Sequence, residues 1–385
     1  MSIQGSVSLD EKEIPRSDDS LEVLLQNRIR TGKVSVVHPP HKVTSDVSRA
    51  YLQRWLESKG VDEHLVGKLN SILDKTQIQS RYILLPPDEV LEQRDFHTTN
   101  SQYVKASIEL GTQAVKEALE LNHIHPADVD MFISVSCTGF TIPGIDAHIM
   151  NRLGISAART ILTEHGCAGG TVGLMRAWEY CCAYPERTVV LLAHEFCSQT
   201  FLLDDLSMTN IISSTLFGDG VAATVISAKL NSPEPLPAIQ KCATRFFPDT
   251  LHYMGFELCN EGLRIILSPE IPPFIRKNIE PTLSCFLESC RVKVGALKHF
   301  VLHPGSIRIV EIIGKQLGLA SEKIEPTLNV LFHQGNMSSV TVLAVLQEIQ
   351  LNSAPKDGDL GLMAAFGPGF VAEMALLQWQ EGPGD

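Results

Sequence analysis

The chain has 385 residues, of which 44% are apolar and 20% charged, a composition typical of globular proteins. Its net charge of −12, without a Lys/Arg-rich run, argues against nucleic acid as a partner because phosphate contacts need clustered positive charge. No apolar run reaches the roughly 20 residues that a membrane helix needs, and the amino end carries no visible secretion signal. We therefore expect a cytoplasmic protein without a membrane span.

The sequence contains nine cysteines, an odd number, and no CxxC pair. Together with the absence of a secretory context, this count argues against a disulfide framework and against a zinc site. Most of the cysteines are expected to be small buried hydrophobic residues. We expect no metal.

The first third of the chain yields few chemical signals. Residues 1–35 lack clear periodicity and predict a flexible or loosely docked extension. A strand-like VSVVHPP follows, and a helix is predicted over 45–60, with Ser45 or Asp46 as its cap. A second amphipathic helix is predicted over 107–122.

The order strand, turn, small-residue turn and helix occurs twice in the rest of the chain. In the first half, an apolar strand at 130–139 runs into a turn, GCAGG at 166–170 opens a helix, and 188–196 reads as a buried strand. In the second half, a strand at 297–305 runs into a turn and QGNMSS at 334–339 opens a helix.

The halves are expected at 36–232 and 233–385, with the boundary near LNSPEPLPA and two final strands joined by a Gly-Pro-Gly turn. Alternating strands and helices predict an α/β fold with parallel sheets covered by helices. Two such halves, back to back, would bring both sets of turns to one shared centre.

Cys167 stands apart from the other cysteines. Gly166 precedes it and Ala168-Gly169-Gly170 follow, where the chain enters a helix. Small neighbours permit a tight turn that exposes the sulfur, and a helix start or a His lowers a thiol pKa. The sequence here fits a nucleophile and a buried structural cysteine equally well.

Two further residues lie at strand ends or helix starts. His303, in FVLHPGS, ends an apolar strand, where active-site residues of α/β enzymes commonly lie. A structural turn histidine is the alternative. Asn336 precedes a helix, so helix capping also explains it. In combination, Cys, His and Asn suit acyl transfer, because a thiolate accepts the acyl group while two neutral donors stabilise an oxyanion.

Five blocks around these residues resemble the signatures of type III polyketide synthases, the chalcone synthase superfamily. The blocks are GCAGGTVGL, LFGDGVAATVI, VLHPGSIRIVE, HQGNMSSVTVL and AAFGPGFVAEM, in the order and spacing of the family. The resemblance covers about residues 35–380. It implies a thiolase-like five-layered αβαβα fold with two pseudo-duplicated halves, and a homodimer.

By this resemblance, Cys167, His303 and Asn336 form a catalytic triad. The first residue would carry an acyl-CoA starter, and the other two would hold the thioester carbonyl and promote decarboxylation of malonyl-CoA. Repeated Claisen condensation and cyclisation to a pyrone or phenolic product would follow in one cavity. No further cofactor and no carrier protein would be required.

The resemblance also implies residues that shape the pocket. Phe217 matches the gatekeeper between the CoA tunnel and the cavity, and Cys137 and Cys197 fall at variable pocket positions. Ile142 lies in the segment that reaches the partner's cavity across the dimer. The other implied pocket residues are Ile265, where plant members have a second gatekeeper phenylalanine, and the cavity-wall turn residues Gly367 and Pro368. Core packing or a structural turn is the alternative for each.

The CoA mouth is expected to be basic, since CoA carries phosphates. Lys68 and Lys75 match two of three basic positions in the family, whereas Ser71 occupies the third. Arg308, shortly after His303, is a further candidate for positive charge. A solvated helix face is the alternative reading of each.

Other functions remain to be weighed. A β-ketoacyl-acyl carrier protein synthase III-like enzyme shares Cys, His and Asn but performs one condensation. A hydroxymethylglutaryl-CoA synthase would need a catalytic glutamate, to which the sequence does not point. A catalytically silent scaffold of the same fold would not need all three residues. The short stretch after Cys197 resembles bacterial members.

Overall fold

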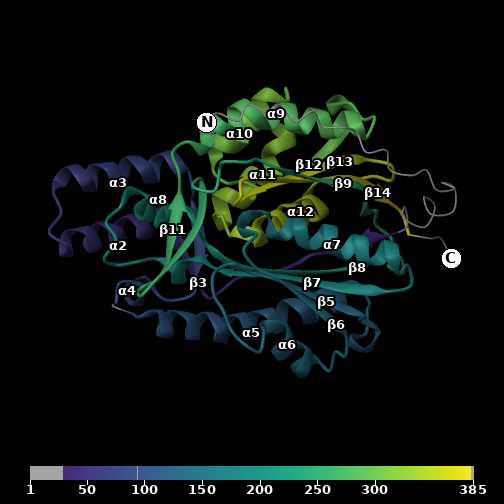
Figure 1. Cartoon of the computed structure of the whole chain (residues 1–385), viewed down its shortest axis with the longest axis horizontal. Coiled ribbons are helices and arrows are strands. Elements are labelled where there is room, and N and C mark those ends of the chain that lie inside the picture. Colours follow the sequence, from purple (N-terminus) through teal and green to yellow (C-terminus); the bar gives the residue numbers. More distant parts are fainter. Residues whose placement is uncertain (1–28, 93, 383–385) are drawn as a thin grey trace, which may run out of the picture.

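The computed structural model describes residues 29–92 and 94–382. Figure 1 shows five layers, with helices α5 and α6 on one outer face and α9 and α10 on the other. Between them lie two sheet layers, which enclose a central layer of α7 and α12. The predicted αβαβα fold is therefore confirmed.

The elements have the following bounds. The strands are β1 (Arg30–Thr31), β2 (Ser35–Val37), β3 (His41–Thr44), β4 (Ser80–Ile83), β5 (Met131–Val135), β6 (Ala158–Leu162), β7 (Thr188–Phe196), β8 (Asp219–Ser227), β9 (Leu236–Phe246), β10 (Met254–Cys259), β11 (Gly262–Leu267), β12 (Leu297–Leu302), β13 (Leu360–Gly367) and β14 (Val371–Gln380). The α-helices are α2 (Ser45–Ser58), α3 (Glu63–Thr76), α4 (Pro87–Val90), α5 (Phe96–Leu121), α6 (Ile145–Leu153), α7 (Gly169–Ala183), α8 (Met208–Leu216), α9 (Ile271–Ser289), α10 (Ile307–Gln316), α11 (Ser321–Gln334) and α12 (Thr341–Asn352). The 3₁₀ turns are η1 (Pro126–Asp128), η2 (Gly166–Ala168), η3 (Cys197–Thr200), η4 (Val294–Ala296) and η5 (Ser338–Val340).

The two sheet layers are joined by hydrogen bonds at one short strand. The strand order is β12-β13-β14-β9-β1-β8-β7-β5-β6, with β2 also paired to β8. β1 pairs with β8 through Arg30 and Thr31 and with β9 through Arg30 alone. Residues 29–31 are buried, so the loosely docked extension predicted for 1–35 does not include residues 29–35. Residues 1–28 lie outside the described part of the chain.

The sheet differs from the expected parallel arrangement. β5 pairs in parallel with β6 and β7, and β12 with β13, whereas β7–β8 and β13–β14 are antiparallel. The chain returns through the β13–β14 hairpin, which makes that pair antiparallel. β7 and β8 are buried along their whole length, which explains their continuous apolar sequences.

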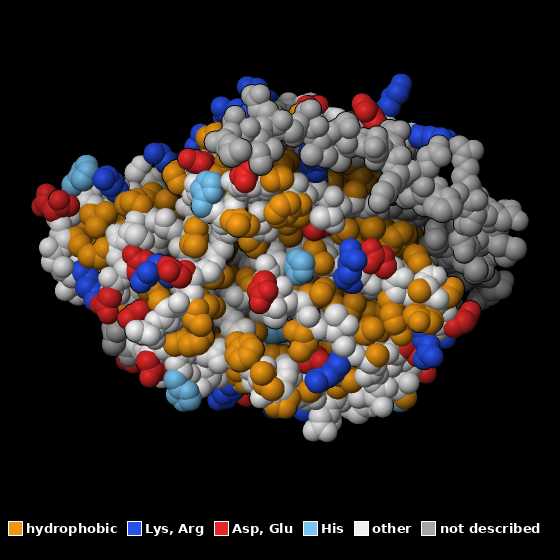
Figure 2. All heavy atoms as spheres, viewed as in Figure 1, with side chains coloured by type: hydrophobic (Ala, Val, Ile, Leu, Met, Phe, Trp, Pro, Cys, Tyr) orange, Lys and Arg blue, Asp and Glu red, His pale blue; other side chains and the backbone are white. Residues whose placement is uncertain are grey.

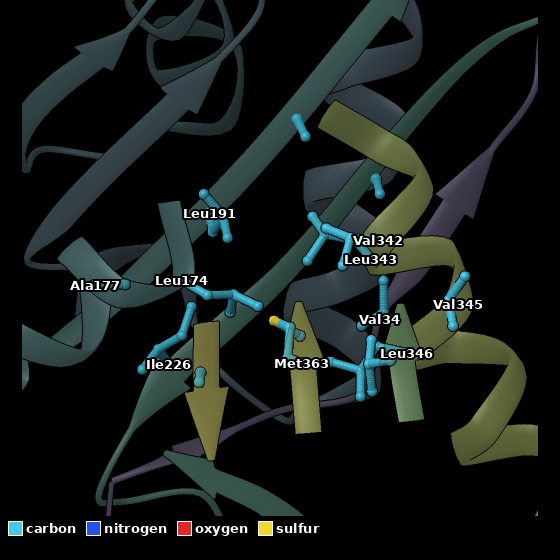
Figure 3. Packing of buried hydrophobic residues seen from close by; sticks show 14 of the residues in the cluster. Val34, Leu174, Ala177, Leu191, Ile226, Val342, Leu343, Val345, Leu346 and Met363 are labelled. Atoms are coloured by element: carbon cyan, nitrogen blue, oxygen red, sulfur yellow. The ribbon is translucent and has the colours of Figure 1, made fainter. Parts of the chain in front are cut away.

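The main core lies between the two sheet layers (Figure 3). Leu174 of α7 and Leu343 of α12 pack there with Leu191 of β7 and Met363 of β13. α7 and α12 are central helices covered on both sides, so their sequences are apolar around most of the helix. This packing fixes the starts of both helices, where the site lies.

Two predicted helix boundaries require correction. α2 is capped by Thr44, whose side chain accepts from the Val47 amide, rather than by Ser45 or Asp46. The helix predicted at 107–122 starts earlier, at Phe96, where the Asp95 side chain caps it. These earlier caps satisfy the free amides of the first turns.

Among the described residues, no helix is long and apolar enough to cross a membrane. On the face shown in Figure 2, the Lys and Arg side chains are dispersed among acidic ones rather than gathered in one patch.

Candidate active site

One cavity of about 880 Å³ brings Cys167, His303 and Asn336 together. Cys167 lies in η2 at the start of α7, His303 directly follows β12, and Asn336 lies between α11 and η5. Three segments that lie far apart in the sequence therefore contribute to one cavity. Much of the wall is apolar and includes Met254, Leu263, Ile271, Ile275, Ile309 and Phe370.

Tight backbone packing presents the Cys167 thiol to the cavity. Gly166 has a φ of +48°, and a Cβ on it would lie 2.8 Å from Pro368 Cδ. A Cβ on Gly170 would lie 2.2 Å from the Ser339 carbonyl oxygen. Only glycine fits at these two positions. The small residues of GCAGG therefore let the segments that carry Pro368 and Ser339 pack closely beside the thiol.

His303 is 1% exposed and yet lines the cavity. Its backbone amide donates to the Ala364 carbonyl at 2.9 Å, which ties the residue to β13. Within the described residues, neither ring nitrogen has a hydrogen-bond partner. Because buried polar atoms are normally paired, the two nitrogens are suited to partners that enter the cavity.

Asn336 is held on both sides of its backbone and at its side chain. Its amide donates to the Leu216 carbonyl at 3.0 Å, and its carbonyl accepts from Gly218 at 2.9 Å. The side-chain Oδ1 accepts from the Ser338 amide at 2.9 Å, and Nδ2 donates to the Gly305 carbonyl at 3.3 Å. The side chain thus has a cap-like contact and also lines the cavity.

Burial governs the protonation of the two reactive groups. It raises the pKa of the Cys167 thiol to about 12, while hydrogen bonds from Ser338 and Asn336 act in the opposite direction. It lowers the pKa of His303 to about 3. Both groups are neutral at pH 7 in this structure, which differs from the lowered thiol pKa that the helix start predicts.

Residues 34–230 match the family model for the N-terminal domain of chalcone and stilbene synthases, and residues 238–379 match that for the C-terminal domain. The chain belongs to this family. It is therefore an acyl-transferring enzyme of the type III polyketide synthase group, and the single-condensation alternative is not favoured.

Relatives and solved structures agree with this assignment. The synthase is 32% identical to a putative chalcone synthase of Bacillus subtilis, over 82% of this chain and 90% of that protein. It is 30% identical to 1,3,6,8-tetrahydroxynaphthalene synthase of Streptomyces peucetius, over 97% of this chain and 99% of that protein. A solved structure also matches, that of 1,3,6,8-tetrahydroxynaphthalene synthase from Streptomyces coelicolor, a bacterial type III polyketide synthase. The match has a TM-score of 0.86 and 26% sequence identity, and it covers 91% of this chain and 99% of that chain.

Five of the seven expected pocket residues of this synthase line the cavity. They are Phe217, Cys137, Cys197, Ile265 and Pro368. Gly367 lies behind the wall, where a Cβ would come within 2.6 Å of the His165 carbonyl oxygen. Ile142 is 82% exposed and does not line the cavity of its own chain.

The expected CoA residues do not line the cavity. Lys68 and Lys75 are exposed on α3, and Arg308 is exposed in the first turn of α10. The structure therefore does not bring these cations to the triad.

The sequence reasoning assigned no site role to three residues around the nucleophile. Ser338 lines the cavity and has a φ of +50°, unusual for a residue with a side chain. Glu164 is the single acidic side chain among the described residues of the cavity wall, and its φ is +66°. Glu195 is buried behind the wall. In the sequence, Glu195 could have been found as the one acidic residue within the apolar run TVVLLAHEF.

Proposed function

We propose that this synthase loads an acyl group from CoA onto Cys167 and extends it repeatedly with malonyl-CoA, using His303 and Asn336. The observation that carries the proposal is the convergence of a thiol, an unpaired imidazole and a fixed carboxamide in one cavity. These groups suit thioester formation followed by stabilisation of an oxyanion.

Loading begins with transfer of the thiol proton from Cys167 to His303. Each charge alone is disfavoured by burial, as the two pKa shifts indicate. Moving the proton creates both charges together, and their attraction offsets part of the desolvation. The thiolate then attacks the acyl-CoA carbonyl, the carbon–sulfur bond to CoA breaks, and CoA leaves as its thiol after taking the proton.

Extension uses the same two donors. Loss of CO₂ from malonyl-CoA leaves an enolate, whose oxygen would accept hydrogen bonds from Asn336 Nδ2 and the protonated nitrogen of His303. The enolate carbon attacks the acyl-Cys167 thioester, and the sulfur leaves. No strong base is needed, because decarboxylation supplies the carbanion.

The cavity volume supports repeated extension and ring closure in one place. We propose a pyrone or phenolic product, formed without a carrier protein or a further cofactor. Two relatives of this chain are a tetrahydroxynaphthalene synthase and a phloroglucinol synthase, which supports a phenolic product. Lys68, Lys75 and Arg308 would attract the CoA phosphates at the mouth, at longer range than direct contacts with the triad.

We also propose a cytoplasmic homodimer. Ile142 is 82% exposed and Phe140, two residues before it, is 64% exposed and lines the cavity. Exposed large apolar side chains at a cavity rim are suited to a protein interface. In the dimer, Ile142 would reach the partner's cavity.

The deciding experiment is mass spectrometry of products from the purified synthase, malonyl-CoA and a panel of acyl-CoA starters. We expect products with two or more added acetate units, and none from Cys167→Ala, with the dimer intact. A single β-ketoacyl product, or activity only with a carrier protein, would support the single-condensation function. Product formation by Cys167→Ala would remove the nucleophile assignment.

A further inference from the structure

Three cysteine thiols line the same cavity, although a single nucleophile is proposed. Cys137, Cys167 and Cys197 all belong to its wall. Cys167 is 8% exposed and Cys197 is 9% exposed, whereas Cys137 is only partly buried. Access alone would therefore favour Cys137. Another feature must select Cys167.

A fully buried carboxylate contacts the competing thiol. Glu195, near the end of β7, is 0% exposed. Its Oε2 accepts from Ser136 Oγ at 3.2 Å, the Cys137 amide at 3.1 Å and Thr138 Oγ1 at 2.8 Å. Its Oε1 accepts from Ser339 Oγ at 2.5 Å and Cys137 Sγ at 3.5 Å.

The directions of these hydrogen bonds favour an ionised carboxylate. Thr138 Oγ1 already accepts from the Phe196 amide at 3.0 Å, and Ser136 Oγ accepts from the Tyr103 hydroxyl at 2.9 Å. Both hydroxyl protons are therefore directed at Glu195. Burial raises the pKa of Glu195, and the hydrogen bonds that it accepts counter this shift.

In the described part of the chain, Glu195 has no cationic partner to neutralise it. Within residues 29–92 and 94–382, no Lys, Arg or His forms an ion pair with its carboxylate. The titratable groups that interact with it are Tyr103 on α5 and the three cavity thiols, all neutral. An uncompensated buried charge is costly, so its position beside reactive groups points to a role in the chemistry.

We propose that Glu195 selects the nucleophile: its carboxylate accepts a hydrogen bond from the Cys137 S–H and so keeps that thiol protonated, which leaves Cys167 as the thiol that reacts. This inference rests on the proposed role of Cys167. Glu195 is thus a specificity-determining residue that acts through its contact with a neighbouring thiol.

The electrostatic environment agrees with this geometry. Burial is the largest cause of the raised thiol pKa at all three cysteines, and the charge of Glu195 adds to it. Cys137 and Cys197 are raised well above their ordinary pKa, and Asp219 adds a further negative charge near Cys197. Cys167 has a donor that the other two lack, the Asn336 carboxamide, which lowers its pKa.

The test compares the wild-type synthase with Glu195→Gln, which keeps the shape of the side chain and removes its charge. Each protein is treated with an acyl-CoA, or with iodoacetamide across a pH series, and digested with trypsin. The peptides 117–152, 160–176 and 188–229 contain Cys137, Cys167 and Cys197 respectively, one cysteine in each. Mass spectrometry then measures the extent of modification of each of the three thiols separately.

Of the three cavity thiols, we expect Cys167 alone to be modified in the wild type near neutral pH, and Cys137 to be modified as well in Glu195→Gln. The thiolate fraction of Cys137 should rise about tenfold for each unit by which its pKa falls, and its labelling rate should rise with it, by a smaller factor because a thiolate of lower pKa is less nucleophilic. Glu373→Gln is the matched control, because Glu373 is also a buried carboxylate with a pKa raised by burial, but it bonds Thr244. This control should label as the wild type does.

Labelling of Cys167 alone in Glu195→Gln, with the wild-type pH profile, would overturn the proposal. If that variant does not fold, the wild-type pH series still decides, because Cys137 must react only at higher pH than Cys167, and the reverse order would refute the selection. A wild-type enzyme that forms no acyl-Cys167 would instead refute the proposed function, whatever the behaviour of Glu195.

Discussion

Phe217 and Asn336 form an isolated parallel β-bridge between the two halves of the molecule. The backbone groups of Asn336 bond to Leu216 and Gly218, the neighbours of Phe217. Phe217, the expected gatekeeper, is therefore held beside Asn336, the proposed catalytic residue, by main-chain contacts. Because side-chain substitutions leave these contacts in place, each side chain can be tested separately.

Removal of the Asn336 carboxamide should affect decarboxylation more than loading. We expect Asn336→Ala to lose about 100-fold or more of its malonyl-CoA decarboxylation rate, since the enolate oxygen loses a donor. Release of CO₂ and formation of the acyl-enzyme are measured in parallel. Equal losses in both steps would contradict this division of roles.

The close approach of Gly170 to η5 should make this position intolerant of a side chain. The backbone of Ser339 would have to move to admit a Cβ, so we expect Gly170→Ala to destabilise the fold by about 1–3 kcal/mol and to reduce activity. Gly67→Ala is the control, because nothing lies within 4 Å of that Cβ in α3. It should raise stability by up to about 1 kcal/mol. Denaturant unfolding measures both, and equal effects would contradict the packing argument.

The buried His194 should make stability depend on pH. Its ring bonds Ser134 and Ser107 at 3.1 Å, and burial lowers its pKa to about 3. The unfolded chain takes up this proton below about pH 6.5, whereas the folded chain does not. The free energy of unfolding should therefore fall as pH drops from 6.5 toward 3, by about 1.4 kcal/mol per pH unit from this residue.

Comparison with His194→Gln isolates this contribution. His38 and His303 also have lowered pKa values and act in the same direction, whereas Asp219, with a pKa raised to about 6, acts in the opposite direction. Denaturant unfolding at pH 6.5 and 4.5 should give a smaller pH dependence for the variant. An unchanged slope would show that His194 does not titrate in this way.

The exposed lysines of α3 should affect substrate capture rather than chemistry. We expect Lys68→Ala and Lys75→Ala to raise KM for malonyl-CoA several-fold, about the effect of one exposed charge, with little change in kcat. The effect should shrink as salt is added, since salt screens exposed charges. Lys116→Ala on α5 serves as a control, because that lysine pairs with Glu120. If all three variants had the same KM for malonyl-CoA and the same salt dependence, α3 would not contribute to CoA binding.

The sequence predicted most features that depend on local pattern. The buried strand at 188–196 and the small-residue turn at Cys167 follow from apolar runs and glycine spacing, and the structure contains both. The antiparallel pairing of β7 with β8 could not be read from these runs, because a strand buried on both faces has the same pattern in either direction.

The role of Glu195 required the three-dimensional structure. The sequence displays one acidic residue in a strand, but the directions of its hydrogen bonds depend on Thr138, Ser136 and Ser339 from distant segments. The raised pKa of the Cys167 thiol could not be predicted from the sequence for a related reason. The helix start is visible in the sequence, whereas the depth of burial is not.

The two-residue strand β1 has a practical consequence for any altered form of this enzyme. Arg30 and Thr31 form the seam at which β8 and β9 are joined, and the Arg30 side chain donates to the Leu230 carbonyl. A shortened chain that starts after Thr31 would expose the edges of both strands and loosen the alignment of Cys167 with His303. Trimming the amino end for crystallisation should therefore stop before Ile29, even though the proposed catalytic residues lie more than a hundred positions away.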